Sequence, residues 1–370
     1  MKNILLFGLF CSSLFLSGYS ADIKSLNPER KEEKSYEINI KMVGDDLIHK
    51  GIYEQCLQSD GSYNFDKVFA NVKKDIEAAD IAIINQETIL VHDKSKISSY
   101  PTFGTPDDIG HAIVSAGFDV IAHSTNHTMD KGIAGINDTI RFWNENYPDI
   151  TYLGIHDSPD DSDVRYLTKN NITVGFVNYT YGLNGLEPYR KGKEYVVDML
   201  SDADIEGTME EASSHSDLLI AVLHAGDEYV YEPTKYQKQQ INKFIDLGAD
   251  IVFCAHPHVL QPYGMVTTPQ GNTALVYYSL GNFISSQNEI PRVLGGMADV
   301  YIQKTIMNGI EKVEITDYTL LPLVTHQEAG NYTTYRLDEY PKDLEKQHRL
   351  LHKGFSISSA KEFINKILNK

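Results

Sequence analysis

Polar residues of the types that bind metal ions follow several apolar segments of this 370-residue chain. Side chains at the carboxyl ends of parallel strands gather at one edge of a sheet, so residues far apart in the chain can converge there. Imidazole and carboxylate ligands together suit zinc, manganese or iron. Seven such residues exceed the needs of one tetrahedral ion, so we expect two ions that share a bridging carboxylate. The residues of these types at the predicted strand ends are Asp45, His49, Asn85, Glu87, Asn126, His127, Asp130, His224, His256 and His258, and seven of them are candidate ligands.

Short apolar strands alternating with helices must position these residues. The run Ile81–Ile84 is continuously apolar, which is typical of a strand buried on both faces. The alternation with helical segments continues to about residue 280 and predicts an α/β fold with helices outside the sheets. The expected strands are Tyr36–Met42, Ile81–Ile84, Asp119–Ala122, Ile150–Leu153, Ile172–Tyr179, Leu218–His224, Asp250–Ala255 and Ala274–Leu280, and the expected helices are Phe65–Ala79, Pro106–Ala116, Ile133–Asn146, Ala203–Ser213 and Lys235–Leu247.

The pattern changes after residue 297. Val300–Met307 and Lys312–Tyr318 flank Asn308-Gly309, a dipeptide that favours a two-residue hairpin turn. From Tyr340 onward the chain is charged and helix-forming. We therefore expect a main domain over residues 36–325 and a charged helical extension over residues 326–370.

The first 20 residues have the composition of an export signal. Met1-Lys2-Asn3 precedes an apolar run, Ile4–Leu16, that is too short to span a membrane and is followed by small residues. We expect cleavage near Ser20, a polar tether over residues 21–35, and export to the surface or exterior of a bacterial cell. Tyr19 stands where a lipoprotein signal has its cysteine, so lipid attachment there is not expected.

The net charge of -18 and the pI near 5.1 argue against nucleic acid as a partner. They leave room for a phosphorylated or polycarboxylate substrate, because bound cations reverse the local potential of a site. After removal of the signal the chain has two cysteines, Cys56 and Cys254. Two thiols are too few for a disulfide framework, and the sequence leaves open whether they pair.

Six blocks of sequence, in order, resemble the poly-gamma-glutamate capsule synthesis (CapA-like) family, a relative of the calcineurin-like metallophosphoesterases. The resemblance covers about residues 36–320. It implies an α/β/β/α sandwich with two mixed sheets. The blocks are Gly44-Asp45, Asn85–Glu87, Asn126–Gly132, His224–Tyr229, His256–Pro262 and Tyr278–Phe283.

The resemblance also implies a role for each candidate residue. Asp45, His49 and His258 would hold one divalent transition-metal ion, and Asn126, His224 and His256 the other, with Glu87 between them. The ions would be manganese, zinc or iron, and a water activated by them would be the nucleophile. His127 would serve as the general acid or stabilise transition-state charge, and Asp130 would orient it.

The family implies a hydrolase or transferase that makes, releases or anchors a capsule or other cell-envelope polymer. The expected partners are an anionic envelope polymer, a phosphorylated or peptidic small substrate, and membrane proteins of capsule synthesis. Two alternatives stay open: a non-catalytic assembly or export factor, and an envelope-binding module that keeps the metal-site fold. The chain departs from the family pattern in the four-residue spacing of Asp45 and His49 and in Ala225, where relatives have Trp.

Each of these assignments has a structural alternative. Asp45 and Glu87 could cap helices, and Asp130 is equally suited to cap the helix expected after it. Arg292 could contact an anionic substrate or be a solvated loop charge. The remaining histidines are interpreted as structural; they are His92, His111, His123, His156, His215, His326, His348 and His352.

Overall fold

Two β-sheets form the centre of the computed structural model, which describes residues 33–202 and 204–368. The first sheet has the strand order β16-β15-β14-β1-β2-β5-β6, and β13 also pairs with β1. Its strands β1, β2, β5 and β6 are parallel, whereas β14, β15 and β16 are antiparallel. The bounds are β1 Glu33–Asp46, β2 Ile81–Asn85, β5 Val120–Ala122, β6 Thr151–Leu153, β13 Asn282–Ile284, β14 Leu294–Met307, β15 Ile310–Glu328 and β16 Asn331–Arg336.

The second sheet has the strand order β11-β12-β10-β9-β8-β7. Its central strands are parallel and both edge strands are antiparallel, so this sheet is mixed as well. The bounds are β7 Arg165–Lys169, β8 Ile172–Thr180, β9 Leu218–His224, β10 Ile251–Ala255, β11 Tyr263–Thr267 and β12 Thr273–Tyr277. A separate pair of two-residue strands is formed by β3 Leu90–Val91 and β4 Thr105–Pro106.

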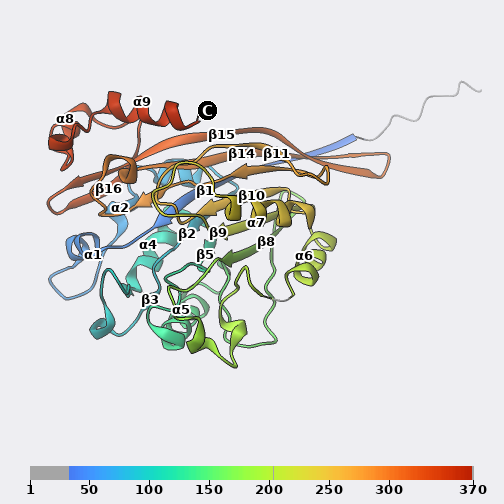
Figure 1. Cartoon of the computed structure of the whole chain (residues 1–370), viewed down its shortest axis with the longest axis horizontal. Helices are drawn as coiled ribbons and strands as arrows, with labels where there is room; N and C mark the ends of the chain where they lie inside the picture. Colours follow the sequence, from blue (N-terminus) through green and yellow to red (C-terminus); the bar gives the residue numbers. More distant parts are fainter. Residues whose placement is uncertain (1–32, 203, 369–370) are drawn as a thin grey trace, which may run out of the picture.

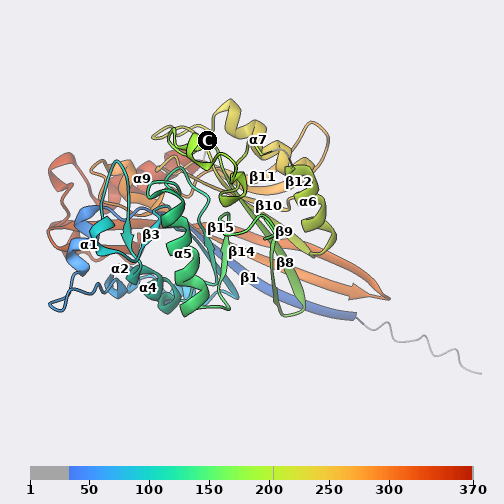
Figure 2. The same ribbon diagram turned by 90° about the horizontal axis from the view of Figure 1, so that it is seen from below.

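Helices cover the outer faces of the two sheets (Figures 1 and 2). Met42 of β1 and Phe253 of β10 belong to one buried cluster between the sheets, which explains the alternation of apolar residues in β1. The opposite face of the first sheet packs on α1 to α5, and that of the second on α6 and α7. The expected α/β/β/α sandwich is confirmed. The helices are α1 Lys50–Cys56, α2 Asp66–Phe69, α3 Lys73–Glu77, α4 Asp108–Ala116, α5 Gly132–Asn146, α6 Ile205–Ser214 and α7 Lys235–Asp246.

The helix expected over Phe65–Ala79 is instead two short helices, α2 and α3. The hydroxyl of Thr333, in β16, donates to the carbonyl oxygens of Lys67 and Val68 at 2.7 and 3.2 Å. A continuous helix would use these carbonyls for its own next turn. A tertiary contact therefore ends α2, and the local pattern could not reveal it.

The C-terminal region completes the first sheet and the core. The expected division at residue 325 falls inside β15, and β16 pairs with that strand. After α8 (Lys342–Glu345), helix α9 (Ile357–Leu368) packs Ala360, Ile364 and Ile367 into the cluster between the sheets. Figure 1 shows both helices in red beside β15. The extension is thus part of the sandwich.

The hairpin predicted at Asn308-Gly309 is confirmed. Both residues have positive φ, 56° and 78°, as a two-residue turn of this type requires. The hairpin end of β14 and β15, with the start of β1, projects beyond the rest of the fold in Figure 2. Residues Glu33–Ser35, expected in the tether, are already paired with β14 in β1, and the expected signal peptide lies outside the described residues.

The described part of the chain also contains five 3₁₀ helices. None of the described helices has the length and apolar composition needed to cross a membrane. Cys56 and Cys254 are free, buried thiols in different core clusters, so they do not pair with each other. The 3₁₀ helices are η1 Lys94–Lys96, η2 Glu187–Arg190, η3 Glu194–Val196, η4 Ile290–Val293 and η5 Leu351–Lys353.

Candidate metal centre

Asp45 lies at the end of β1, where an irregularity in the strand redirects its side chain. The register with β2 shifts between Val43 and Asp45, so Gly44 is an extra residue of the bulge type. A Cβ on Gly44 would lie 1.9 Å from the carbonyl oxygen of Gly281, so this close approach requires glycine. The bulge moves Asp45 off the face that Val43 shares with the helices. Its buried carboxylate accepts from the backbone N–H of His256 at 3.3 Å.

Glu87 follows β2 and is 1% exposed. Its Oε1 lies 3.8 Å from Nε2 of His224 and 3.7 Å from Nε2 of His258. Burial raises the pKa of Glu87 well above its usual range; His258 opposes the shift and Asp45 adds to it. The carboxylate thus stands between histidines from different parts of the second sheet.

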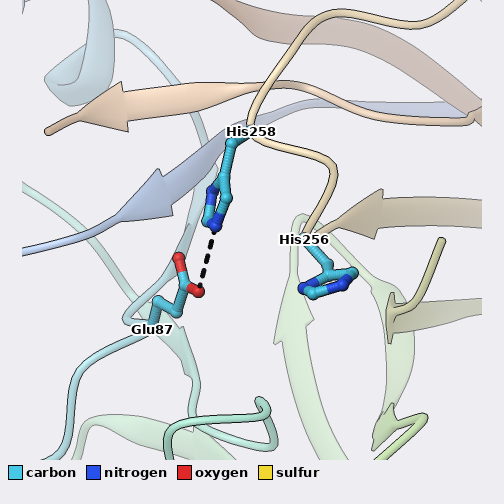
Figure 3. Close-up of side chains that lie close together, drawn as sticks. All are labelled: Glu87, His256 and His258. Carbon is cyan, nitrogen blue, oxygen red and sulfur yellow. Dashed lines mark ion pairs between the residues drawn. The ribbon is translucent and has the colours of Figure 1, made fainter. Parts of the chain in front are cut away.

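Three of the four predicted histidine ligands converge at the ends of β9 and β10. His224 is the last residue of β9, and its ring centroid lies 5.0 Å from that of His256. Ligand atoms of Glu87, His256 and His258 all lie within 4.8 Å of one another. Figure 3 shows the Glu87 carboxylate directed at His258, with His256 beside them. The backbone at His256 and His258 has φ of 102° and 56°, strained values for non-glycine residues that are typical of functional sites.

The histidines differ in their electrostatic surroundings. Burial lowers the pKa of His224 and His256 well below the usual value, and neighbouring histidines add to the effect. Burial also lowers the pKa of His258, but the carboxylates of Glu87 and Asp45 outweigh it and raise the pKa to about 9. Neutral imidazole is the form that ligates a metal, so His224 and His256 are already in a suitable state near pH 7.

The loop after β5 brings Asn126, His127 and Asp130 to the same place. Asn126 Oδ1 lies 2.9 Å from Nε2 of His224, the residue predicted to share its ion. His127 Nδ1 lies 2.7 Å from Asp130 Oδ2, which also accepts from the backbone N–H of Phe103 at 2.6 Å. Asp130 makes no helix cap, because α5 begins after Lys131 and has no side-chain cap. The orienting contact is therefore present, and the capping alternative is excluded.

His49 is held by its own contacts, and the charges of His258 and His127 act on its ring. Its Nδ1 lies 3.0 Å from the carbonyl oxygen of Leu47, and its ring makes an edge contact with Phe103 at 5.3 Å. The Phe103 ring also contacts His127 at 4.7 Å. Among the described residues, the recorded hydrogen bonds and ring contacts of His49 involve Leu47, Ser286 and Phe103, not the carboxylates. Burial lowers the pKa of His49 to about 4, so its ring is neutral.

Several buried atoms of this cluster lack hydrogen-bond partners within the described part of the chain. They include both carboxylate oxygens of Glu87, Nδ1 of His256 and Oδ1 of Asn85. Leaving such groups unpaired is costly, and a bound cation would supply the partner that the carboxylate and the imidazole lack. The mixture of nitrogen and oxygen donors fits a divalent transition metal. The residues present therefore fit a metal ion.

Three further residues lie at this site, none of which the sequence reasoning named as a ligand. Asn85 donates from Nδ2 to Asp45 Oδ1 at 2.9 Å and lies 3.4 Å from Nδ1 of His224. Asn282 places Oδ1 3.0 Å from Nδ1 of His258 and so supports that ring. Asp46 is fully buried without a hydrogen-bond partner among the described residues, and burial raises its pKa well above normal. Their positions in the sequence could have drawn attention to two of them, because Asn85 is two residues before Glu87 and Asp46 directly follows Asp45.

A family model described as bacterial capsule synthesis protein PGA_cap matches residues 39–287. The chain belongs to this capsule synthesis family. The resemblance drawn from the six sequence blocks is therefore confirmed, and every candidate ligand lies within the matched residues.

Capsule synthesis proteins of two bacilli are among the relatives. The PGA biosynthesis protein CapA of Bacillus subtilis (strain 168) is 25% identical over 79% of this chain and 74% of its own length. The capsule biosynthesis protein CapA of Bacillus anthracis is 27% identical over 70% of this chain. The match spans 62% of that relative's length, less than two thirds.

Solved structures with a similar chain trace include two enzymes. A phosphatase from Mycoplasma pneumoniae superposes with a TM-score of 0.45 and 14% identity, over 79% of this chain and 95% of that one. The NAD nucleotidase of Haemophilus influenzae gives a TM-score of 0.42 and 12% identity, over 90% of this chain and 60% of that one. Both scores are below 0.5, so membership in the capsule synthesis family rests on the sequence match.

Proposed function

We propose that this capsule synthesis family member is an exported, metal-dependent hydrolase or transferase that acts on a cell-envelope polymer or its precursor. The observation that supports it most is the buried convergence of Asp45, Glu87, His224, His256 and His258, with both oxygens of Glu87 left without a hydrogen-bond partner among the described residues. Export is supported by the signal-like composition of residues 1–20.

The proposal assigns two groups of ligands around Glu87. Asp45, His258 and, after a turn of its ring, His49 would hold one ion, and Asn126, His224 and His256 the other. When bound, two such ions would supply an activated water and positive charge for the oxygens of the reacting group. The protein itself would hold these ligands rigid, because each lies at a strand end or in a loop tied down by hydrogen bonds.

His127 is the proton donor of the proposed reaction. Its hydrogen bond from Nδ1 to Asp130 leaves Nε2 to carry and transfer the proton to a leaving oxygen. His127 is 7% exposed, more than any of the buried ligands around Glu87, so substrate reaches it more easily. Asp130 holds the ring in place without contacting the reacting atoms.

Arg292 is the residue we assign to an anionic substrate. Its guanidinium carbon lies 3.5 Å from the centre of the Tyr229 ring, and that ring lies 6.0 Å from His258. The stacking holds the guanidinium beside the candidate metal centre while its edge donors stay available for carboxylate or phosphate oxygens. Such a contact suits a polymer rich in negative charge.

A second candidate function is a non-catalytic assembly factor that uses the metal site for stability alone. The dyad of His127 and Asp130 weighs against it, because a structural site has no need of an oriented, unligated imidazole. Hydrolysis of bis(para-nitrophenyl) phosphate by the purified protein separates the two. We expect metal-dependent turnover that is lost in His127→Ala with metal content retained. A protein that binds metal yet hydrolyses neither activated esters nor envelope polymer would support the assembly factor.

A further inference from the structure

We infer that His156, Asp163 and Asp198 form a separate binding site for a divalent transition-metal ion. Ligand atoms of these three residues all lie within 4.8 Å of one another. Nε2 of His156 lies 2.9 Å from Asp198 Oδ1 and 3.7 Å from Asp163 Oδ1. One imidazole with two carboxylates is a donor set that suits zinc, manganese or iron. The inference does not depend on the proposed reaction.

The arrangement around His156 is that of a metal ligand with its supporting residue. The other ring nitrogen, Nδ1, lies 3.1 Å from Asp161 Oδ2. In metal sites a carboxylate commonly accepts from the nitrogen that does not bind the ion, which fixes the tautomer and the ring orientation. Asp161 is itself held by Arg165, whose Nη2 donates to Oδ2 at 2.8 Å. The ring therefore directs Nε2 at the two remaining carboxylates.

A second observation also indicates a ligand. Asp198 is 3% exposed, and its Oδ2 has no hydrogen-bond partner among the described residues. Arg165 pairs with Asp161 and also acts on Asp163 from a greater distance, whereas the ion pair of Asp198 is with His156. A buried oxygen without a partner next to an imidazole and a second carboxylate is the environment that a divalent cation stabilises.

The position of the site suggests what the ion would do. His156 lies in the connection between β6, at the edge of the first sheet, and β7, at the edge of the second. Asp198 lies in the segment before α6, and its carbonyl oxygen accepts from the hydroxyl of Ser124 at 2.6 Å. Ser124 is two residues before the candidate ligand Asn126. An ion at His156 would thus fasten two loops together and stiffen the backbone that carries Asn126.

The test measures zinc binding to the purified protein. His256→Ala is present in every sample to weaken the main centre, so the parent here is the His256→Ala protein. Calorimetric titration with ZnCl₂ should show a site that Asp163→Asn weakens at least tenfold. Asp161→Asn should weaken it by about 10- to 100-fold, as for other supporting residues. Asp160→Asn, an exposed aspartate in the same loop, is the matched control and should leave binding unchanged. Zinc should also raise the melting temperature of the parent more than that of Asp163→Asn.

The alternative to a metal is a protonated His156 shared among the three aspartates. It predicts identical zinc isotherms for the parent, Asp163→Asn and Asp160→Asn, and that result would overturn the inference. Asp163 has 39% of its side chain exposed, so its substitution tests the site even if replacement of buried Asp198 prevents folding. Loss of the site in Asp163→Asn would support the inference, and hydrolysis of an activated phosphodiester by Asp163→Asn with His256 intact would test the proposed function separately.

Discussion

The carboxylate of Asp130 lies 2.7 Å from Nδ1 of His127 and also accepts the backbone N–H of Phe103. Asp130 thereby joins the loop after β5 to the loop around Phe103 and fixes the orientation of an imidazole next to the candidate metal centre. The contact links residues three apart in the chain. The histidines of the candidate metal centre beside it lie about 100 to 130 residues further along the chain.

The first prediction concerns this pair. His127→Asn should lower kcat for bis(para-nitrophenyl) phosphate by about 10²- to 10⁴-fold, the usual range for a general acid. Asp130→Asn should lower it by about 10- to 100-fold, because the ring keeps its chemistry but loses its support. Metal content should stay at the parent level in both. Equal turnover in the parent and His127→Asn would remove His127 from the proposed reaction.

Arg292 provides a test of substrate charge. Arg292→Gln should raise KM for an anionic substrate by about tenfold or more, because a charge-assisted hydrogen bond is lost, while kcat and metal content change little. Arg141→Gln, in which an exposed arginine of α5 is changed in the same way, serves as the control. If KM is the same in all three proteins, Arg292 is a solvated loop charge.

Glu87→Gln should have opposite effects with and without metal. In chelator-treated protein the amide removes a buried carboxyl group that has no hydrogen-bond partner among the described residues, so the melting temperature should stay level or rise. Added Mn²⁺ or Zn²⁺ should then stabilise the variant less than the parent; an ion at 100 times its Kd contributes about 2.7 kcal/mol. Glu54→Gln, on the exposed side of α1, is the control. A parent-like increase in melting temperature would exclude Glu87 as a ligand.

Acid should weaken the packing of the C-terminal region. His348 accepts from the backbone N–H of Leu350 at 3.1 Å and faces the carbonyl oxygen of Thr325 at 3.1 Å, so its ring is neutral. Burial lowers its pKa to about 4, below the 6.5 of an unfolded histidine. The unfolded state therefore binds the proton first, and this stability is present above pH 6.5 and is lost as pH falls toward 4.

Chemical denaturation across that pH range checks the prediction. His348→Gln should be less stable than the parent at pH 7 but should lose less stability between pH 6.5 and 4. His352→Gln, an exposed histidine nearby, should keep the parental pH dependence. Parallel curves for all three proteins would show that His348 does not contribute to acid sensitivity.

Helix α9 should contribute to the stability of the whole sandwich. Ile364 is 2% exposed and belongs to the cluster between the sheets. Ile364→Ala should lower the free energy of unfolding by about 2–4 kcal/mol, as for other large-to-small core changes. Ile310→Ala, at a residue that is 74% exposed, should change it by less than about 0.5 kcal/mol. A separate low-temperature transition for Ile364→Ala would instead indicate an independent extension.

The sequence by itself determined the alternation of strands and helices, the hairpin at Asn308-Gly309, the family, and the types of residue at the candidate centre. These features depend on local periodicity, turn chemistry and short motifs, which a linear chain displays directly. The order of strands in a sheet and the contacts between loops involve residues distant in the chain, and only the tertiary structure decided them. It decided that the bulge at Gly44 redirects Asp45, that the ring of His49 faces the carbonyl oxygen of Leu47, and that α9 belongs to the core. It also brought His156 next to Asp163 and Asp198, since that cluster exists only where the edges of the two sheets meet.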